Sequence, residues 1–425
     1  MDIRLTLPVA VANRHIKISG SKSETNRLLL LQALFPGITI ENASSSDDSE
    51  VMLKALAGND DVVDIHHAGT AMRFLTAYYA QQESREVVLT GSARMKERPI
   101  AILVDALRSL GASIEYAEEE GFPPLKIIGR KLSGGRVTLP ANISSQYITA
   151  LLLIAGRLDN GLELTLEGEI TSRPYIEMTL ALLKEIGIAA NFQGNRIIVQ
   201  PATGNRQPAT INLTVESDWS SASYFYSIIA LSPEGTAITL SSYKKDSLQG
   251  DSALQHIYRK LGVETKFDND TITLRKENRQ LSTVNCQLNN TPDIAQTIAV
   301  TCFGLGIGCH LTGLHTLKIK ETDRLSALKA ELGKLGAKVD ITDDTLTLYP
   351  HSLFTAGVLH LGSFSFGEGW GEDPIQTYND HRMAMAFAPL AIKRDIIIQD
   401  AGVVSKSYPV FWDDLKRLGF EITAL

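Results

Sequence analysis

The sequence has few cysteines and no excess of positive charge, and each shortage excludes a class of protein. Its 425 residues include three cysteines, Cys286, Cys302 and Cys309, an odd number set among apolar residues. We therefore expect reduced core thiols in a cytoplasmic protein and no disulfide framework. Acidic residues outnumber basic residues by 48 to 41, and the net charge of −7 argues against nucleic acid or an anionic membrane as a partner.

Long hydrophobic runs are also missing. No stretch approaches the roughly 18 apolar residues that a membrane-spanning helix needs. The first ten residues, MDIRLTLPVA, lack the basic start and apolar core of a signal peptide. The hydrophobic fraction of 44% is ordinary for a globular protein, and 425 residues are many for one core. We therefore expect two domains.

A recurring pattern organises the chain. Six segments read as an amphipathic helix that ends near a glycine and leads into alternating strand residues. They are residues 49–64, 102–115, 180–192, 254–267, 328–340 and 411–422. Their glycines, each expected at the C′ position of the helix, are Gly58, Gly111, Gly187, Gly262, Gly336 and Gly419. The pattern predicts two pseudo-symmetric domains of three helix–strand units each, because six units of this length do not fit a solenoid.

A second set of segments opens helices with hydroxyl groups and cations. The first, SGSKSETNR, places Lys22 and Arg27 at the mouth of a leucine-rich helix, where the helix dipole disfavours cations unless an anion is bound. Ser21 and Glu24 have the spacing of a capping box, and two solvated surface cations are the ordinary interpretation. The other segments are residues 66–75, 90–100, 142–156, 171–180, 292–300, 318–329, 378–391 and 405–415.

Taken singly, these segments also have ordinary interpretations. Serine and aspartate serve as N-caps, and Glu321 and Arg324 have the spacing of an ion pair on a solvated helix face. Their repetition in both halves of the chain instead indicates helix N-termini that together bind a multiply charged anion. Asp293 and Glu321, set among cations, are then the acid and base candidates.

The motifs in chain order resemble those of the 5-enolpyruvylshikimate-3-phosphate (EPSP) synthase family. They are GSKSETNR, AGTAMR, RMKERPI, SSQ, SRPY, PD, KETDR, NDHRMAM and SKSYP, and they span residues 20–410. The resemblance implies a transferase, 3-phosphoshikimate 1-carboxyvinyltransferase. It moves the enolpyruvyl group of phosphoenolpyruvate to the 5-hydroxyl group of shikimate 3-phosphate and releases phosphate by addition and elimination. In the family this step leads to chorismate and the aromatic amino acids, with no metal or other cofactor.

The resemblance also implies the architecture. The expected fold is α/β, a two-domain inside-out α/β barrel with three βαβαββ units in each domain. The N-terminal domain is expected at residues 20–215 and the C-terminal domain at residues 1–19 plus 216–425, with the active site in the cleft between them. A cytoplasmic monomer is expected, with small-molecule substrates and neither nucleic acid nor membrane as a partner.

Roles for individual residues follow from the same motifs. Phosphoenolpyruvate is expected to contact Lys22, Gly69, Arg98, Gln146, Arg324, Arg382 and Lys406. Shikimate 3-phosphate is expected to contact Lys22, Ser23, Arg27, Ser144, Ser145, Gln146, Ser172, Tyr175, Asp293, Thr316 and Lys320. The expected catalytic residues are Lys22, Asp293, Glu321, His381 and Lys406.

Three positions depart from the family pattern. His67 and Thr316 stand where the family commonly has Asn, and Phe74 stands where it usually has Pro. His67 lies on the phosphoenolpyruvate side of the family's site, and the position of Thr316 normally touches a hydroxyl group of shikimate. Inhibition of the family by glyphosate depends on a small residue at Gly69, so sensitivity to glyphosate is expected.

Two alternatives remain. The first is the related enolpyruvyl transferase that acts on UDP-N-acetylglucosamine, which usually carries Cys or Asp in the loop ahead of its arginine. Residues 90–100, TGSARMKERPI, contain neither. The second is a non-catalytic, anion-binding relative, in which carboxylates among cations would have no purpose.

Overall fold

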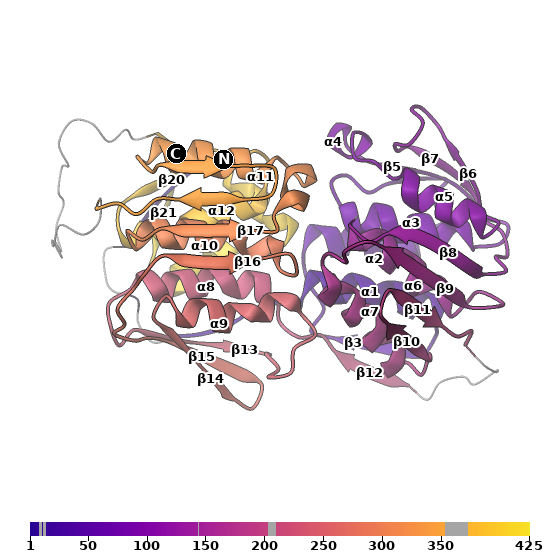
Figure 1. Ribbon diagram of the computed structural model, residues 1–425, viewed down its shortest axis with the longest axis horizontal. Helices are drawn as coiled ribbons and strands as arrows, with labels where there is room; N and C mark the ends of the chain where they lie inside the picture. Colours follow the sequence, from indigo (N-terminus) through magenta and orange to yellow (C-terminus); the bar gives the residue numbers. More distant parts are fainter. Residues whose placement is uncertain (8–10, 12–13, 143, 203–209, 353–372) are drawn as a thin grey trace. The chain divides into compact units, whose positions relative to one another are not determined.

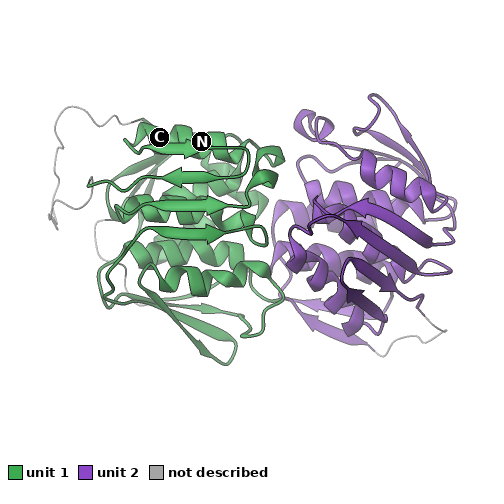
Figure 2. Cartoon of the chain, viewed as in Figure 1, with its two compact units in different colours: residues 1–19, 216–425 green, residues 20–215 purple. Residues whose placement is uncertain are grey.

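The chain divides into two compact units, one of which combines two separate stretches of the sequence. The computed structural model describes residues 1–7, 11, 14–142, 144–202, 210–352 and 373–425. One unit comprises residues 20–215, and the other comprises residues 1–19 together with 216–425 (Figure 2). The polypeptide therefore passes between the units twice.

Most of the sheets share one topology. Four sheets have the strand orders β4-β5-β7-β6, β8-β9-β11-β10, β2-β13-β15-β14 and β16-β17-β19-β18. In each of these orders the first two strands are parallel, and the third and fourth strands form an antiparallel hairpin. The third strand of the order also pairs antiparallel with the second. In three of the sheets one helix joins the two parallel strands, whereas between β2 and β13 the chain first runs through residues 20–215 and then through one helix. A further helix leads into each hairpin, which gives the order βαβαββ (Figure 1).

The unit of residues 20–215 contains two of these sheets and a third, shorter one, in which β3 pairs in parallel with β12. Its strands are β3 (Ile38–Glu41), β4 (Val62–Asp64), β5 (Glu86–Thr90), β6 (Ser113–Tyr116), β7 (Leu125–Ile128), β8 (Gly135–Pro140), β9 (Leu162–Glu167), β10 (Ala190–Gln193), β11 (Arg196–Val199) and β12 (Ile211–Thr214). Its helices are α1 (Lys22–Leu34), α2 (Asp47–Ala57), α3 (Gly69–Ala80), α4 (Ala93–Lys96), α5 (Ala101–Ser109), α6 (Ser145–Ala155) and α7 (Arg173–Glu185).

The other unit uses the N-terminal segment to complete two of its sheets. Strand β2 stands first in one sheet, and β1 lies between β20 and β21 in another, where Ile375 also bridges Ile398 in parallel. The strands are β1 (Ile3–Thr6), β2 (Arg14–Lys17), β13 (Ala237–Ser241), β14 (Val263–Asp268), β15 (Thr271–Lys276), β16 (Val284–Gln287), β17 (Cys309–Thr312), β18 (Val339–Ile341), β19 (Leu346–Leu348), β20 (Ile396–Ile398) and β21 (Glu421–Ala424). The α-helices are α8 (Trp219–Leu231), α9 (Leu254–Arg259), α10 (Ala295–Gly304), α11 (Arg324–Lys334), α12 (His381–Phe387) and α13 (Phe411–Arg417). The 3₁₀ helices are η1 (Gly250–Ala253), η2 (Pro292–Ile294), η3 (His315–Ile319), η4 (Ala388–Ile392) and η5 (Ala401–Lys406).

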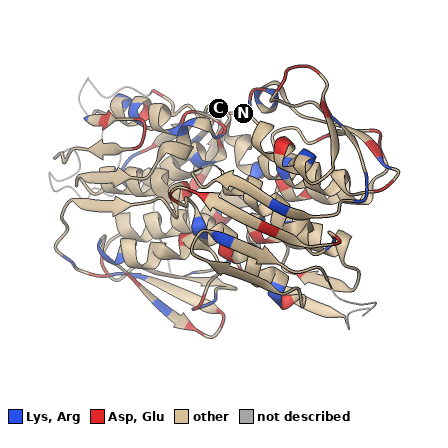
Figure 3. Cartoon of the chain, turned by 45° about the vertical axis from the view of Figure 1, so that its right-hand side comes forward, with Lys and Arg blue, Asp and Glu red and all other residues tan. Residues whose placement is uncertain are grey.

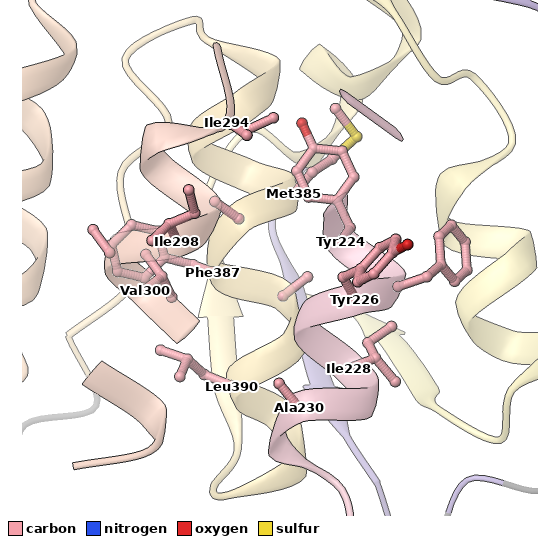
Figure 4. Packing of buried hydrophobic residues seen from close by; sticks show 14 of the residues in the cluster. Tyr224, Tyr226, Ile228, Ala230, Ile294, Ile298, Val300, Met385, Phe387 and Leu390 are labelled. Carbon is pink, nitrogen blue, oxygen red and sulfur yellow. The ribbon is translucent and has the colours of Figure 1, made fainter. Parts of the chain in front are cut away.

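Helices, not sheets, form the interior of each unit. Every residue of α10 and α12 and nearly every residue of α8 is buried, and these helices pack on one another (Figure 4). In the unit of residues 20–215, α3 and α6 are similarly buried, and α1 packs on both. Helices that are apolar on every side must be surrounded. Strands such as β8 and β9 alternate buried and more exposed residues, as expected for sheets that cover the helices with one face and meet water with the other.

The repeated helix–strand pattern is confirmed in five of its six copies. The pairs α5–β6, α7–β10, α9–β14, α11–β18 and α13–β21 each lead into an antiparallel pairing within one sheet. Their glycines, Gly111, Gly187, Gly262, Gly336 and Gly419, have φ angles from +80° to +101°. Four of them follow the C-cap residue directly, while Gly262 lies one residue further on.

The expectation for Gly58 is wrong. Gly58 is the C-cap itself, with a φ of −86°, so the chain leaves α2 in an extended direction. Strand β4 then pairs in parallel with β5, so the strand that follows α2 begins the next βαβαββ sheet, whereas the strands that follow the other five helices pair antiparallel.

Candidate active site

In the unit of residues 1–19 and 216–425, the N-terminal ends of three buried helices meet around Arg382. Arg382 lies in the first turn of α12, whose N-cap, Asp380, accepts a hydrogen bond from the Arg382 backbone N–H at 2.9 Å. The guanidinium Nη1 of Arg382 donates to the carbonyl oxygen of Asp293 at 3.1 Å, just before α10. Its Nη2 donates to the hydroxyl group of Ser220 at 3.3 Å, in the first turn of α8.

Asp293 is held among three cations. Its carboxylate lies 3.0 Å from Nη1 of Arg324, 3.4 Å from Nζ of Lys320 and 3.4 Å from Nη2 of Arg382. Burial acts to raise the pKa of Asp293, but Lys320, Arg382 and Arg324 together outweigh it and hold that pKa well below its usual range. Burial also lowers the pKa of Lys320, although Asp293 opposes the shift.

Arg324 binds three carboxylates at once. Nε and Nη2 donate to Asp380 at 2.7 and 3.3 Å, Nη1 donates to Asp293 at 3.0 Å, and Nη2 donates to Glu321 at 2.9 Å. The interpretation of Glu321 and Arg324 as a pair on a solvated helix face is therefore wrong, because Arg324 is only 1% exposed. Burial acts to lower the pKa of Arg324, but Asp380, Glu321 and Asp293 raise it above its usual value.

Glu321 links Arg324 to Lys406. Its Oε1 lies 2.9 Å from Nζ of Lys406, at the end of η5. His381 is buried with its Nδ1 3.8 Å from Oδ1 of Asp380. The hydroxyl group of Thr316 in η3 is buried and has no hydrogen-bond partner among the described residues.

In the unit of residues 20–215, the first residue of α1 carries one half of an ion pair. Ser21 is the N-cap of α1, as its spacing to Glu24 predicts, and its hydroxyl group accepts from the backbone N–H of Glu24. Nζ of Lys22 lies 3.1 Å from Oδ2 of Asp48, in the first turn of α2. The side chain of Lys22 is only 16% exposed, so it is not a solvated surface cation.

Arg27 is more deeply buried than Lys22 and joins three helices. Its guanidinium donates to the Ser23 carbonyl at 2.6 Å within α1 and to the Thr149 hydroxyl at 3.2 Å in α6. In α7 it donates to the Thr179 hydroxyl at 2.9 Å and to the Tyr175 carbonyl at 3.2 Å. Burial lowers the pKa of Arg27 to about 10. The surface interpretation is therefore wrong for Arg27 as well.

Two residues that depart from the expected motifs, Phe74 and His67, have defined contacts in the unit of residues 20–215. The ring of Phe74 lies 5.6 Å from Cζ of Arg27, so its apolar face packs against the guanidinium. Nδ1 of His67 and the hydroxyl oxygen of Ser92 are 2.9 Å apart. Ser92 is the N-cap of α4, so His67 contacts the start of the basic segment that carries Arg98.

Gly69, at the start of α3, packs directly against Arg98. A Cβ atom on Gly69 would lie 2.6 Å from Nη1 of Arg98, a distance too short for real contacts. Buried Arg73 fastens the residue after Arg98 to the same helix, because it donates to the carbonyl oxygen of Pro99 at 3.1 Å as well as to that of Gly69 at 3.3 Å. The lack of a side chain at Gly69 therefore allows the guanidinium of Arg98 to lie at the N-terminus of α3.

The N-terminus of α6 adds polar groups next to Gly69. Nε2 of Gln146 donates to the hydroxyl group of Thr70 at 3.2 Å. Ser144 is the N-cap of α6, with Ser145 as the first helical residue; Ile143, within the same predicted segment, lies outside the described residues. At the start of α7, Ser172 adopts a left-handed φ of +54°, and the ring of Tyr175 lies 5.8 Å from Cζ of Arg27.

Known proteins resemble this chain along most of its length. The sequence model of the family described as EPSP synthase (3-phosphoshikimate 1-carboxyvinyltransferase) matches residues 54–415. The 3-phosphoshikimate 1-carboxyvinyltransferase of Bacteroides fragilis strain YCH46 is 46% identical over 410 residues, covering 96% of this chain and 95% of its own length. The enzyme of the same name from Pasteurella multocida strain Pm70 is 35% identical over 445 residues, covering 97% and 96%.

The chain belongs to the EPSP synthase family. A solved structure of an EPSP synthase from Acinetobacter baumannii superposes with a TM-score of 0.78 over 100% of both chains, at 21% identity, and so agrees in fold. The family and fold class expected from the motifs are thus confirmed.

In this EPSP synthase family member, most predicted residues of the unit of residues 1–19 and 216–425 form one cluster, whereas those of residues 20–215 form several small groups. In residues 216–425, one cluster of ion pairs joins Asp293, Lys320, Glu321, Arg324, Arg382 and Lys406, with His381 beside it. In residues 20–215, Gly69 and Arg98 form one contact, Gln146 lies against Thr70, and Ser23, Arg27 and Tyr175 form another group.

Three carboxylates of the site were missed or left without a role by sequence reasoning. Asp48 follows a Ser N-cap and looks like an ordinary acidic first turn. Asp380 stands inside the NDHRMAM motif, yet its role in holding Arg324 depends on tertiary structure. Asp251 lies in η1, outside every motif, and no sequence signal marks it.

Charged residues of both signs are interspersed along the ribbon of both units (Figure 3). Among the described residues, no helix combines the length and the apolar character needed to cross a bilayer.

Proposed function

We propose that the residues clustered in the two units carry out one reaction together, the transfer catalysed by 3-phosphoshikimate 1-carboxyvinyltransferase. Membership of the family supports this activity and does not favour the UDP-N-acetylglucosamine transferase or a non-catalytic relative. The observation that carries the proposal is Asp293, a buried carboxylate that contacts Lys320, Arg324 and Arg382. An anion-binding protein would gain nothing from a carboxylate that neutralises its own cations.

The two substrates are anions, and they take over cations that are paired in the structure. Arg324 and Arg382 bind the carboxylate of phosphoenolpyruvate, because a planar guanidinium suits a carboxylate better than an ammonium group does. Lys22, Arg98 and Lys406 bind its phosphate group, near the backbone of Gly69 and the amide of Gln146. Lys22, Arg324 and Lys406 contact Asp48, Asp293 or Glu321 in the structure, so binding exchanges one anionic partner for another.

Shikimate 3-phosphate is bound mainly by the unit of residues 20–215. Ser23 and Arg27 lie near its carboxylate, with the ring of Tyr175 beside it. Four groups bind its phosphate: Ser144, Ser145, Ser172 and Lys320. Thr316 supplies a hydroxyl group toward the ring hydroxyls of the substrate, where the buried, unpartnered Oγ1 makes a hydrogen bond favourable.

The exchange of partners activates Asp293. While Lys320, Arg324 and Arg382 face Asp293, its pKa is far below neutral pH and the carboxylate is a weak base. Substrate anions draw these cations into new ion pairs, which removes the influence that lowers the pKa. Asp293 then accepts the proton of the 5-hydroxyl group as the oxygen attacks the central carbon of phosphoenolpyruvate.

Glu321 moves the second proton. During addition it delivers a proton to the methylene carbon, which forms a tetrahedral intermediate. During elimination the bond from the central carbon to the phosphate oxygen breaks, and Glu321 takes a proton back from the methyl carbon. The proton that Asp293 accepted passes to the departing phosphate, so both carboxyl groups return to their starting states. Lys22 and Lys406 stabilise the departing phosphate by charge. His381 supports the reaction from beside Asp380, the residue that holds Arg324.

We also propose that the active site lies in a cleft between the units, with residues 20–215 on one side and residues 1–19 with 216–425 on the other. Support comes from the division of phosphate and carboxylate ligands between the two sets of buried helices. Glyphosate inhibits by taking the place of phosphoenolpyruvate beside Gly69 and Arg98. The protein acts as a cytoplasmic monomer, in keeping with its free cysteines Cys286, Cys302 and Cys309.

The activity is tested by measuring phosphate release from phosphoenolpyruvate with each of two acceptors. Shikimate 3-phosphate is expected to support continuous release, and UDP-N-acetylglucosamine is expected to support none. Release with the UDP-sugar alone would favour the related transferase. Release with neither acceptor would favour the non-catalytic relative.

A further inference from the structure

A buried carboxyl group that the proposed reaction does not use lies behind Arg382. Asp251 is 4% exposed, and its Oδ2 accepts a hydrogen bond from the hydroxyl group of Ser220. The oxygen of the same hydroxyl group accepts from Nη2 of Arg382 at 3.3 Å. A continuous chain of hydrogen bonds therefore runs from the guanidinium through Ser220 to Asp251.

The chain of hydrogen bonds is held rigidly by Gln249, two residues before Asp251. The Gln249 side chain accepts from the backbone N–H of Trp219 at 2.9 Å and donates to the carbonyl oxygen of Ser217 at 2.9 Å. It also donates to buried Glu216 at 3.4 Å. These bonds fasten η1 to the first turn of α8, so Asp251 stays next to Ser220 and cannot turn toward water.

The second oxygen of Asp251 has no hydrogen-bond partner among the described residues. An ionised carboxylate in such a place is costly, whereas a protonated one is tolerated. Burial and the charge of Asp293 raise the pKa of Asp251 to about 7, while Arg382 and the Ser220 hydroxyl group oppose the shift and Asp218 adds to it slightly. The carboxyl group therefore changes charge close to neutral pH.

We propose that Asp251 is a positioning residue for Arg382: through Ser220 it orients the guanidinium, and when ionised it weakens the binding of the substrate carboxylate. A negative charge behind Arg382 offsets part of the positive charge that it presents to an anion. The neutral carboxyl group keeps the orientation without this cost. The inference rests on the proposed contact between Arg382 and phosphoenolpyruvate.

The proposal predicts the direction in which the affinity for phosphoenolpyruvate changes with pH. As pH rises through 7, Asp251 ionises and the affinity for phosphoenolpyruvate falls. Because linkage is reciprocal, phosphoenolpyruvate in turn favours the protonated form of Asp251. Coupling between two sites typically changes affinity by about fivefold or more, so the change is large enough to measure.

The experiment compares the KM for phosphoenolpyruvate, at saturating shikimate 3-phosphate, between pH 5.5 and pH 9. Asp251→Asn keeps the neutral form at every pH. Its KM should equal the wild-type value at pH 5.5 and be about fivefold lower at pH 9. Ser220→Ala should shift the pH dependence toward higher pH, because the hydrogen bond from Ser220 lowers the pKa of Asp251 and the variant removes that bond while the carboxyl group stays in place. At each pH the KM of the variant is divided by that of the wild type, so the ionisation of phosphoenolpyruvate itself cancels in the ratio.

Asp414→Asn is the matched control. Asp414 is also a buried carboxyl group whose pKa is raised by burial, but its partners are Tyr408 and Arg417, not Arg382. Its KM ratio to wild type should not vary with pH. A ratio for Asp251→Asn that is the same at every pH would overturn the inference, as would wild-type pH dependence in Ser220→Ala if Asp251→Asn fails to fold.

Arg382→Gln separates this inference from the proposed function. If Arg382→Gln leaves the KM for phosphoenolpyruvate unchanged, the proposed contact itself is wrong. If it raises that KM while Asp251→Asn shows no pH-dependent ratio, only the positioning role of Asp251 is wrong.

Discussion

At the scale of single residues, the chemistry of the site is set by charges that neutralise one another. Lys320, Arg324 and Arg382 surround Asp293, and Lys406 pairs with Glu321. Burying such groups is costly, and it is tolerated because each charge has a partner of opposite sign. The same pairing keeps the pKa of Asp293 low and the carboxylate weakly basic, and the proposed mechanism requires anionic substrates to draw the cations away.

Gly69 is the residue at which one methyl group would disturb the site most directly. A Cβ atom there would lie 2.6 Å from Arg98, so Gly69→Ala must displace the guanidinium. We expect a higher KM for phosphoenolpyruvate and weaker inhibition by glyphosate, measured by steady-state phosphate release. Gly333→Ala is the control, because a Cβ atom on exposed Gly333 meets nothing within 4 Å. Unchanged inhibition in Gly69→Ala would contradict the placement of glyphosate beside Arg98.

At the scale of helices and strands, two kinds of helix alternate along the chain. Amphipathic helices such as α5, α7 and α11 end at left-handed glycines, and apolar helices such as α6, α8 and α10 form the interior. The first kind was predictable from sequence, because helical periodicity and a glycine after the last turn are local signals. The boundaries of α9 and the role of Gly58 were not, since they depend on which strand the following residues pair with.

Replacing glycine by alanine is expected to change the free energy of unfolding in opposite directions at Gly111 and Gly333. Gly111 has a φ of +101° and a Cβ atom there would meet nothing within 4 Å, so Gly111→Ala is opposed by backbone conformation alone. We expect it to destabilise the protein by about 1–2 kcal/mol. Gly333→Ala, inside α11, is expected to stabilise it by about 0.5–1 kcal/mol. Urea unfolding of both variants checks the signs, and destabilisation by Gly333→Ala would contradict the assignment of Gly333 to a regular helix interior.

At the scale of the whole molecule, the family and its motifs were predictable from sequence, and the partners of the charged residues were not. KETDR and NDHR mark Arg324 and Arg382 as important, but the spacing of Glu321 and Arg324 resembles that of an exposed ion pair. Only the fold shows that Asp380, from a segment 56 residues away, neutralises Arg324. Arg27 was equally ambiguous, because Thr149 and Thr179, which bury it, are distant in sequence.

The proposed cleft between the units predicts a change of shape on ligand binding. If both units contribute ligands to the same substrates, anions should draw the opposed helix N-termini together and exclude water. The radius of gyration from small-angle X-ray scattering should therefore decrease when shikimate 3-phosphate and glyphosate are both added. An unchanged scattering curve at saturating ligand would argue against closure of a shared site.

The most direct test of the mechanism is the rate of phosphate release by Asp293→Asn in a single turnover with both substrates bound. Asparagine keeps the shape of the side chain and removes its ability to accept the proton of the 5-hydroxyl group. Loss of a general base typically costs a factor of about 10²–10⁴ in rate. We expect a decrease of that size with undiminished binding of phosphoenolpyruvate, because Lys320, Arg324 and Arg382 lose a competing anion. A single-turnover rate equal to that of the wild type would contradict the role of Asp293 as the base.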